Sequence, residues 1–440
     1  MKDEIFSIIK KEERRQRTEL VLIPSENYAS AAVMKAVGSV LMNKYSEGQV
    51  GRRYYQGNAN IDDVERTCKE RALRLFGLDG GEWSVNVQAL SGSPANLAVL
   101  VALVEPGQRI FSMFLPDGGH LSHGWHLPDR PVSFASKIWD VVFYHVDRKT
   151  RVFDYDRIGK DAATVTPRII ISGGTAYPRE IDHRRMGEIA KAVGAWYLAD
   201  IAHEAGLVSA GVNTSPFSYA DVVTMTTHKT LRGPRGAMIF SRKDLSAKID
   251  AAVFPGIQGG PHEHTIAGIA VALREASGGT FRKYAAQVVA NAKVMAEELS
   301  NAGFDVVTGG TDKHLVLVDL RSRKLDGWTG AWGLESAGII VNRNTVPYDT
   351  ASSFYPSGIR LGTPAVTTRG MKEREMRRVV SWIQDVLSHV SNLKLPKQPS
   401  DRAPFLQMLS KDSFLSRIKR EVSTFANRFP VPGIDRPKNL

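Results

Sequence analysis

Cysteine is nearly absent from this chain of 440 residues, in which Cys68 is the only one. One cysteine excludes an internal disulfide and favours a reducing compartment, so we expect the protein to be cytoplasmic. No apolar run is long enough to span a bilayer, and the first residues lack the apolar segment of a signal peptide. The sequence therefore predicts no association with a membrane.

Acidic residues are too few to balance the basic ones. The chain has 58 Lys and Arg against 46 Asp and Glu, which gives a formal net charge of +12. Clustered basic residues are typical of nucleic-acid binding, but here they are scattered, and glutamates interrupt the densest run at residues 10–17. The charge favours anionic small substrates, and we do not expect a nucleic-acid partner.

What the chain does contain is an alternation of short apolar segments with amphipathic ones. It predicts an α/β fold with a mainly parallel sheet. From residue 304 the elements become shorter, which predicts a separate α+β domain. We therefore expect an N-terminal helix and arm at 1–53, a large domain at 54–272 and a small domain at 273–440. The predicted strands of the large domain are residues 84–90, 110–115, 168–172, 196–199 and 221–225.

Several of these strands end in polar residues, and ligands bind at this edge of an open α/β sheet. Lys229 follows the strand at 221–225 after two threonines and a histidine. Because burial and nearby cations lower the pKa of an amine, a lysine placed there can form a Schiff base. A solvated lysine in a loop would fit the same local pattern.

Three other strand ends carry candidate ligand-binding residues. Ser91-Gly92-Ser93 opens a helix whose free N–H groups and dipole would bind an anion, although helix capping explains the same residues. Asp200 could hold a protonated ring nitrogen or cap a turn, and His203 follows it three residues later. His120 comes after two glycines and is either a ligand-binding residue or a loop histidine without that role.

Four further segments stand out. Residues 43–57 hold three tyrosines, one glutamate and three glycines, which predicts an irregular functional loop or a subunit contact. Residues 251–261 are rich in glycine and are predicted to be a loop. The spacing of His262-Glu-His264 is not that of a helical zinc pair, so we expect no metal. Arg360, in a predicted strand, could grip a carboxylate or lie on the surface.

With these residues placed, the sequence resembles the serine hydroxymethyltransferases, which are pyridoxal-phosphate enzymes of the aspartate-aminotransferase-like fold. The resemblance runs from about residue 22 to about residue 370. The matching stretches are Ser25-Glu-Asn-Tyr28, Asn43-Lys-Tyr-Ser-Glu47, Arg53-Tyr-Tyr55, Ser91-Gly-Ser93, Gly118-Gly-His-Leu-Ser-His-Gly124, Asp200-Ile-Ala-His203, Thr226-Thr-His-Lys229, Gly259-Gly-Pro261 and Gly358-Ile-Arg360.

The resemblance implies fold type I, in which a mainly parallel seven-stranded sheet lies between helices, with pyridoxal phosphate as cofactor. Lys229 would hold the cofactor as an imine, and Asp200 would keep its ring nitrogen protonated. The other cofactor-binding residues implied are Ser91, Gly92, Ser93, His120, Thr175, His203 and His228, with Tyr55, Gly259 and Gly260 from a neighbouring subunit. The catalytic residues implied are Lys229, Glu47, Tyr45, His203 and Thr226.

The resemblance further implies tetrahydrofolate as cosubstrate and a homodimer, with a dimer of dimers as the alternative. Serine would be converted to glycine and its one-carbon unit to 5,10-methylenetetrahydrofolate, with Glu47 moving the proton. The residues implied at the amino acid are Ser25, Tyr45, Glu47, Tyr55 and Arg360. The residues implied at the folate are Glu47, Leu115, Gly119, Leu121 and Asn344.

Some residues depart from the family pattern. Gly48-Gln-Val-Gly51 stands where the family usually has Gly-Tyr-Pro-Gly, and Pro94 replaces a common glutamine. These departures lie around the phosphate and the pterin approach. They leave open a relative that acts on α-methylserine, or a folate-independent aldolase of β-hydroxy amino acids such as threonine. The positive charge alone suggests a third alternative, a catalytically silent RNA-contacting protein.

Overall fold

The computed structural model describes residues 3–393, 396 and 398–435. The chain divides into two compact units: Ala29–Ala286, here called the sheet unit, and Met1–Tyr28 with Gln287–Leu440, here called the terminal unit. The predicted domain ranges 1–53, 54–272 and 273–440 stay predictions. They also take in residues 1–2, 394–395, 397 and 436–440, which lie outside the described residues.

The sheet unit is built on seven strands in the order β4-β12-β11-β10-β9-β5-β8. β12 is antiparallel to both of its neighbours, and the other neighbouring strands run parallel. This arrangement confirms the predicted mainly parallel seven-stranded sheet. The strands are β4 (Trp83–Asn86), β5 (Arg109–Met113), β8 (Asp140–Tyr144), β9 (Ile169–Ser172), β10 (Trp196–Asp200), β11 (Val222–Thr226) and β12 (Ala237–Arg242).

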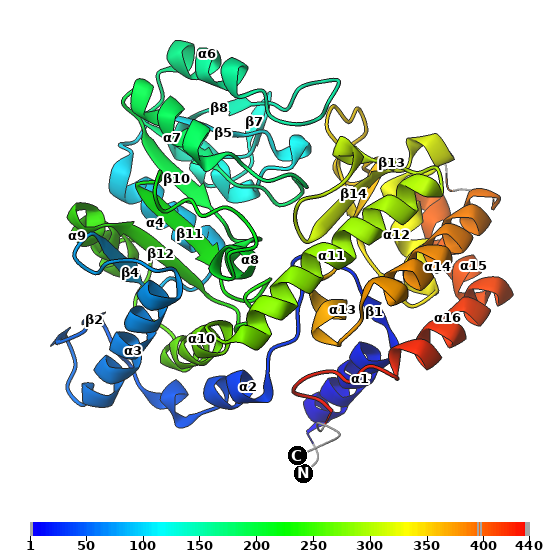
Figure 1. Ribbon diagram of the computed structural model, residues 1–440, viewed down its shortest axis with the longest axis horizontal. Coiled ribbons are helices and arrows are strands. Elements are labelled where there is room, and N and C mark those ends of the chain that lie inside the picture. The colour runs from blue at the N-terminus through cyan, green and yellow to red at the C-terminus, as the bar shows by residue number, and fades with distance from the viewer. Residues whose placement is uncertain (1–2, 394–395, 397, 436–440) are drawn as a thin grey trace. The chain divides into compact units, whose positions relative to one another are not determined.

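Helices cover both faces of this sheet (Figure 1). One face packs against α4 and α9, and the other against α6 and α7, which also contact each other. β9 reads Ile-Ile-Ile-Ser and is buried along its whole length, as expected of a strand covered on both sides. The helices of this unit are α2 (Ala31–Val37), α3 (Ala59–Leu75), α4 (Gly92–Leu103), α5 (Ala135–Ile138), α6 (Tyr155–Val165), α7 (His183–Ala192), α8 (Ala205–Ser209), α9 (Ser246–Ala251) and α10 (Glu263–Ala276).

One predicted loop is partly helical. Residues 252–257 continue directly from α9, with a break in the helical geometry at Phe254 (φ −131°, ψ 126°). The loop prediction for 251–261 was therefore wrong over its first half. The physical reason is burial: Ala252 and Val253 are buried, and this segment packs against α4.

Two short hairpins complete the unit: β2 (Gly48–Gln49) with β3 (Arg52–Arg53), and β6 (His126–Leu127) with β7 (Arg130–Pro131).

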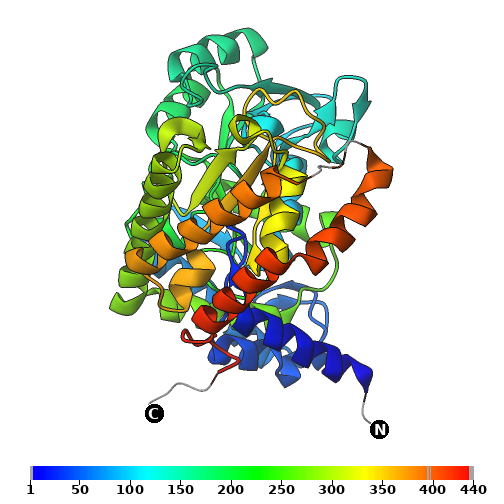
Figure 2. The same cartoon turned by 90° about the vertical axis from the view of Figure 1, so that its right-hand side faces the viewer.

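The terminal unit is a smaller α+β body, as predicted. Its four-stranded sheet has the order β13-β14-β17-β16 and is antiparallel throughout, and β1 pairs with β15 separately. The helix α1 lies alongside α16, blue beside red in Figure 2. Its strands are β1 (Leu20–Val21), β13 (Asp305–Val306), β14 (Leu315–Asp319), β15 (Ile339–Ile340), β16 (Asn342–Asn344) and β17 (Gly358–Gly362). Its helices are α1 (Glu4–Thr18), α12 (Gly327–Ser336), α13 (Pro364–Thr368), α14 (Glu373–Ser391), α15 (Arg402–Lys411) and α16 (Ser413–Ala426), while α11 (Gly279–Asn301) runs through both units.

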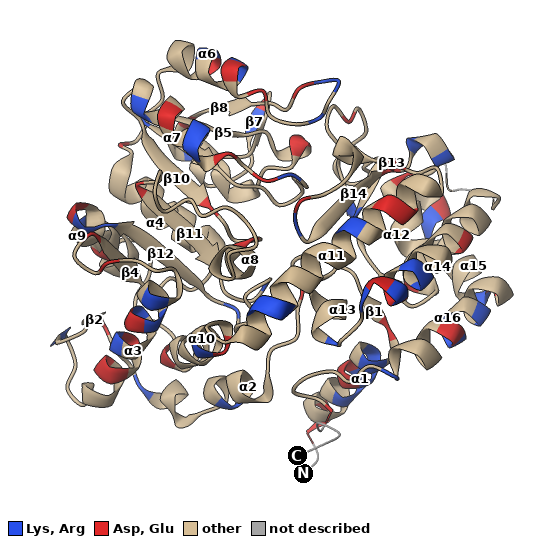
Figure 3. Cartoon of the chain, viewed as in Figure 1, with Lys and Arg blue, Asp and Glu red and all other residues tan. Residues whose placement is uncertain are grey.

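Charged residues of both signs are interspersed along the outer helices, for example along α3, α14 and α16 (Figure 3). None of the helices in the described part of the chain combines the length and the apolar character that crossing a bilayer requires.

Candidate active site

The carboxyl end of β11 presents Lys229, whose exposed fraction is 8%. The strand is buried throughout, and the threonine that ends it and the one that follows it fix the turn. Oγ1 of Thr226 donates to the carbonyl of Ala202 (3.0 Å), and Oγ1 of Thr227 donates to the carbonyl of Pro234 (2.6 Å). The amine at this strand end is therefore a largely buried group on a hydrogen-bonded turn rather than a solvated surface charge.

Asp200, the last residue of β10, is held by three donors. Its Oδ2 accepts hydrogen bonds from Nε2 of His123 and Nδ2 of Asn96, both at 2.8 Å, and its Oδ1 accepts one from the backbone N–H of Ala202 (2.9 Å). Asn96 is oriented in turn by Oγ1 of Thr224, which donates to its Oδ1 (2.6 Å). One carboxylate thus joins β10, β11, α4 and the loop after β5.

This network keeps Asp200 ionised. Burial by itself would raise the pKa of the carboxyl group, but the hydrogen bond and positive charge of His123, with smaller contributions from His120 and Asn96, outweigh it. The pKa of Asp200 therefore lies well below its usual range. An ionised, buried carboxylate at a sheet edge suits a protonated ring nitrogen of a ligand.

The loops after β5 and β9 bring His120 and Thr175 to the same edge. Nδ1 of His120 hydrogen-bonds Oγ of Ser122 (2.7 Å), and Oγ1 of Thr175 hydrogen-bonds Nε2 of His203 (3.3 Å). Gly173 makes this approach possible: its φ is +126°, and a Cβ there would lie 2.2 Å from the carbonyl oxygen of Asp200. A glycine is therefore required where β9 passes the aspartate.

The turn Ser91-Gly92-Ser93 opens α4 against the end of β11, because a Cβ on Gly92 would lie 2.7 Å from Cγ2 of Thr226. The Ser91 side chain makes no capping hydrogen bond, so it leaves the first-turn N–H groups to another acceptor. A helix N-terminus with free N–H groups binds phosphate well.

His228 precedes Lys229 and is neutral. Burial, together with the charges of Lys229 and Arg235, lowers its pKa to about 3. Ring nitrogens of His120 and His123 and a carboxylate oxygen of Asp200 lie within 4.8 Å of one another, a spacing that a metal ion could also use. Two of these three groups, His123 and Asp200, are already hydrogen-bonded to each other. That the protein binds no metal stays a prediction.

A second group of predicted site residues gathers at the segment before the β2–β3 hairpin. The hydroxyl of Tyr45 donates to Oε1 of Glu47 (3.0 Å), and the rings of Tyr45 and Tyr55 meet edge to face at 5.4 Å. Gly260 packs on the Tyr45 ring, since a Cβ there would lie 3.1 Å from Cζ, and a Cβ on Gly259 would lie 3.6 Å from the Glu47 carboxylate.

The predicted folate residues divide between the units. Leu115, Gly119 and Leu121 lie on the loop after β5 that carries His120, where Leu121 is 52% exposed and a Cβ on Gly119 would lie 2.3 Å from the carbonyl oxygen of Met113. Asn344 lies on β16 of the terminal unit, where its Nδ2 donates to the carbonyl of Thr345 (2.7 Å).

Arg360 and Ser25 belong to the terminal unit. The Arg360 side chain is buried on β17, where its Nε donates to Oδ1 of Asn342 (3.1 Å) and burial lowers its pKa to about 10. The segment that carries Ser25 runs beside the same strand, because the N–H of Gly362 donates to the carbonyl of Leu22 (2.7 Å). These two residues therefore lie on neighbouring segments of one unit.

Sequence reasoning gave no role to Asn96 or His123, the two side chains that hold Asp200. The only signal was their position. His123 is the second histidine of the motif that contains His120, and Asn96 lies on the first turn and a half of the helix opened by Ser91. A side chain one helical turn past a phosphate turn faces the same sheet edge, so that spacing could have suggested Asn96.

The residues present fit pyridoxal phosphate. An uncapped helix suits its phosphate, an ionised carboxylate suits its ring nitrogen, and a buried amine suits its aldehyde. Together with the mainly parallel sheet, they define a pyridoxal-phosphate enzyme of fold type I.

Comparison with known proteins narrows this class to one family. A family model described as serine hydroxymethyltransferase matches residues 1–383. The chain is 48% identical over 446 residues to a probable cytosolic serine hydroxymethyltransferase of Schizosaccharomyces pombe, with 97% of this chain and 95% of the relative covered. It is 50% identical over 433 residues to a serine hydroxymethyltransferase of Acidothermus cellulolyticus (98% and 96% covered), and 47% identical over 442 residues to a chloroplastic one of Arabidopsis thaliana (98% and 83%). The chain therefore belongs to the serine hydroxymethyltransferase family, whose enzymes use pyridoxal phosphate and tetrahydrofolate.

Proposed function

We propose that this protein converts serine and tetrahydrofolate to glycine and 5,10-methylenetetrahydrofolate, and the reverse, with pyridoxal phosphate as cofactor. The observation that carries the proposal is Asp200, held ionised by three donors at the sheet edge that also presents Lys229. Membership of the family supports the choice of substrates.

The sheet unit would hold the cofactor. Lys229 binds the aldehyde, Asp200 keeps a proton on the ring nitrogen, and the first-turn N–H groups of α4 bind the phosphate with Ser91 and Ser93. His120 covers the ring, and Thr175, His203, Thr226 and His228 complete the surroundings. When bound, the cofactor supplies an electron sink that allows the Cα–Cβ bond of serine to break.

Residues around the substrate would bind it and move its proton. Arg360 binds the amino-acid carboxylate, because a guanidinium whose pKa is about 10 is still a cation at neutral pH, and Ser25 assists it. Cβ leaves at the oxidation level of formaldehyde and tetrahydrofolate takes it with release of water, while Cα gains a proton. Glu47, whose Oε1 accepts the Tyr45 hydroxyl, moves that proton. Leu115, Gly119, Leu121 and Asn344 contact the folate.

We also propose a homodimer, in which Tyr55, Gly259 and Gly260 reach the cofactor of the neighbouring subunit. Large apolar side chains that a second copy could cover are exposed in both units: Ile5, Phe6, Ile8 and Ile9 in one and Val40, Met42 and Tyr54 in the other. Light scattering should then give the mass of two chains, and Phe6→Glu should lower it. A wild-type mass of one chain would contradict the dimer.

We propose a cytoplasmic location, which the lone buried cysteine and the cytosolic relative support. Relatives named mitochondrial and chloroplastic also occur, so fractionation of the source cells is the test. Recovery of the protein in an organelle fraction would contradict the proposal.

The central test is glycine formation from serine by the protein loaded with pyridoxal phosphate, with and without tetrahydrofolate. We expect strong stimulation by tetrahydrofolate, and a loss of multiple turnover and of the visible absorbance of the bound cofactor in Lys229→Ala. No stimulation, with continued cleavage of threonine, would instead identify an aldolase. A preference for α-methylserine over serine would change the substrate, and a colourless protein would contradict the proposal altogether.

A further inference from the structure

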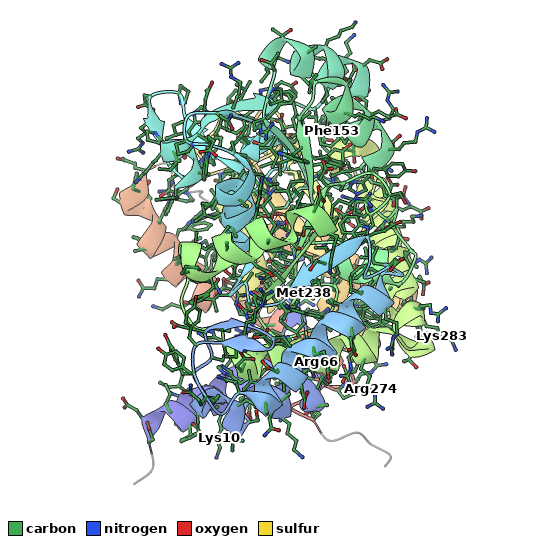
Figure 4. All side chains as sticks on the ribbon, turned by 90° about the vertical axis from the view of Figure 1, so that its left-hand side faces the viewer. Lys10, Arg66, Phe153, Met238, Arg274 and Lys283 are labelled. Carbon is green, nitrogen blue, oxygen red and sulfur yellow. The ribbon has the colours of Figure 1, made fainter. Side chains whose placement is uncertain are left out.

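Two glutamates lie close together in the interior of the sheet unit. Glu65 lies on α3 and is 0% exposed, and Glu263 is the first residue of α10 and is 1% exposed. The helices α3 and α10 pack against each other, and the two carboxyl groups lie close enough together for a hydrogen bond. Arg66, the neighbour of Glu65, points to solvent instead (Figure 4).

A hydrogen bond between two carboxyl groups requires one proton, and the neighbours show which group carries it. Glu65 accepts from Nε2 of Gln88 (3.0 Å) and pairs with Nη2 of Arg53 (2.9 Å), so its negative charge is satisfied. Oε2 of Glu263 is buried, and among the described residues no N–H or O–H group donates to it. A proton on Oε2 that is donated to Glu65 removes this defect, because a buried oxygen without a partner is destabilising.

The other oxygen of Glu263 reaches the segment that carries two predicted catalytic residues. Oγ of Ser46, a fully buried hydroxyl, donates to Oε1 of Glu263 at 2.5 Å. Ser46 lies between Tyr45 and Glu47, whose side chains are hydrogen-bonded to each other. The backbone on the other side is fixed as well, since Gln88 Nε2 and Arg53 Nη1 both donate to the carbonyl of Gly48 (3.0 and 2.7 Å).

We propose that Glu263 is a positioning residue for the segment Tyr45–Glu47, and that it acts as a neutral carboxylic acid which donates to Glu65 and accepts from Ser46. It touches neither substrate nor cofactor and acts through Ser46. The effect on catalysis rests on the proposed function, whereas the protonation of the pair does not.

The surroundings agree with a neutral Glu263. Burial and the negative charge of Glu65 raise its pKa to about 8, against smaller opposing effects of Ser46 and Arg53. The other titratable and charged groups on the helices packed around the pair, and on the short segments that flank them, are Asp62, Asp63, Arg66, Cys68, Lys69, Glu70, Arg71 and Arg74 on α3, His262, His264, Arg274 and Glu275 on or next to α10, and Lys35 and Lys44 from α2 and the segment after it. Near neutral pH the pair therefore holds one proton.

The sign of the pH dependence follows from this raised pKa. The folded chain keeps a proton that a carboxyl with the ordinary pKa of 4.5 releases on unfolding. The contribution of Glu263 to stability is therefore lost as the pH rises from about 4.5 through about 8. Glu263→Gln keeps both hydrogen bonds, since its amide donates to Glu65 and its carbonyl accepts from Ser46, but it cannot titrate.

The first experiment measures protonation without any activity. Infrared difference spectra at neutral pH should contain the carbonyl band of a protonated carboxylic acid, and Glu263→Gln should remove it. Urea unfolding is then measured from pH 6 to pH 9. The urea concentration at the unfolding midpoint should fall with pH for the wild type relative to Glu263→Gln, so that the plots of midpoint against pH diverge as the pH rises. Glu70→Gln, which neutralises an exposed glutamate on the same helix as Glu65, should follow the wild type in both measurements.

The second experiment measures kinetics with serine and tetrahydrofolate. Glu263→Ala should lower kcat on the order of 10- to 100-fold with a smaller change in KM, because it displaces the segment but leaves the groups that bind the substrate carboxylate in place. In the wild type we expect kcat to decline above about pH 8, where Glu263 loses its proton. Glu263→Gln should keep kcat near the wild-type value at neutral pH and should not show this decline. Ser46→Ala should lower kcat but keep the infrared band, since it breaks the link to the segment and leaves the proton in place.

The outcomes separate this inference from the proposed function. If the protein has no hydroxymethyltransferase activity but the infrared band and the urea curves behave as expected, the protonated pair stands and the proposed function fails. If the wild type lacks the band and its urea curve runs parallel to that of Glu263→Gln, the inference is overturned whatever the activity. Normal kcat in Glu263→Ala would overturn the positioning role.

Discussion

Asp200 and Glu263 are both buried acids of the sheet unit, yet their pKa values move in opposite directions. Burial acts on both in the same sense and favours the neutral form. Asp200 is surrounded by donors, namely His123, Asn96 and the N–H of Ala202, and stays ionised. For Glu263, burial and the negative charge of a second carboxyl group raise the pKa to about 8, so it keeps a proton.

Burial alone therefore does not decide whether an acid is charged. The hydrogen-bonding partners of its carboxyl group decide it. A carboxylate that receives three donors replaces its lost hydration, whereas one that meets another carboxylate cannot. The two sites therefore perform different tasks with the same functional group. One offers a fixed negative charge at the sheet edge, and the other offers a proton that joins two helices. Variants that remove the charge of Asp200, or a donor from the acid pair, test this contrast.

The largest expected effect is on turnover in Asp200→Asn. The amide keeps the size of the side chain but cannot stabilise a positive charge on the cofactor ring, so we expect kcat to fall on the order of 10²–10³-fold. The measurement is serine cleavage with tetrahydrofolate, normalised to the cofactor content of each preparation.

The matched control is Asp244→Asn, which neutralises an exposed aspartate of the same unit and should leave kcat within twofold, as is usual for surface substitutions of about 0.5 kcal/mol or less. If Asp200→Asn kept more than a tenth of the wild-type turnover, turnover would not depend on the negative charge of Asp200. The functional contrast between Asp200 and Glu263 would then fail.

Much of the sheet edge could be predicted from the sequence, because strand ends are local patterns. Lys229, Asp200 and His120 each follow a short apolar segment, and the structure places all three at the carboxyl ends of their strands. Their partners could not be predicted in this way. Asn96 and Asp200 are 104 positions apart, and only the packing of α4 against the sheet decides that they touch. Family resemblance supplied roles, but not this contact.

The acid pair was missed for a related reason. Glu263 stood out only as the middle of His262-Glu-His264, for which we expected no metal, and no pattern in the sequence singled out Glu65. Two strands of the seven-stranded sheet were missed as well, β8 at one edge of the sheet and β12, the antiparallel one. Short apolar runs do not distinguish a strand from other buried segments, and β12 begins directly after the turn that ends the Lys229 segment.

The next effect is on stability in acid, and its sign is opposite to that of Glu263. Because the folded pKa of Asp200 is lowered, its stabilising contribution is fully present above the ordinary value of 3.8 and is lost as the pH falls below it. We expect Asp200→Asn to be less stable than the wild type by about 1.5–3 kcal/mol at pH 7, as for hydrogen bonds to a charged group.

Urea unfolding at pH 7, 5, 4 and 3 checks this expectation, and the gap between the two proteins should narrow only at the acidic end. The gap between the wild type and Glu263→Gln should change only between about pH 4.5 and 8. A gap for Asp200→Asn that is constant down to pH 3 would show that the aspartate is not held ionised by its donors.

The smallest effect is expected for Gln88→Leu, which removes a hydrogen-bond donor from Glu65, the other member of the acid pair. Nε2 of Gln88 donates to both oxygens of Glu65, at 3.0 and 3.1 Å, and its loss leaves that carboxylate with Arg53 and the proton of Glu263 as its remaining partners. We expect a loss of about 1–3 kcal/mol in the free energy of unfolding at pH 7, the usual effect of removing a donor from a buried acceptor. Gln407→Leu, an exposed glutamine on α15, should change it by about 0.5 kcal/mol or less. Equal urea midpoints for the two variants would mean that Glu65 is not the charged member of the pair, and the contrast with Asp200 would then rest on Glu263 alone.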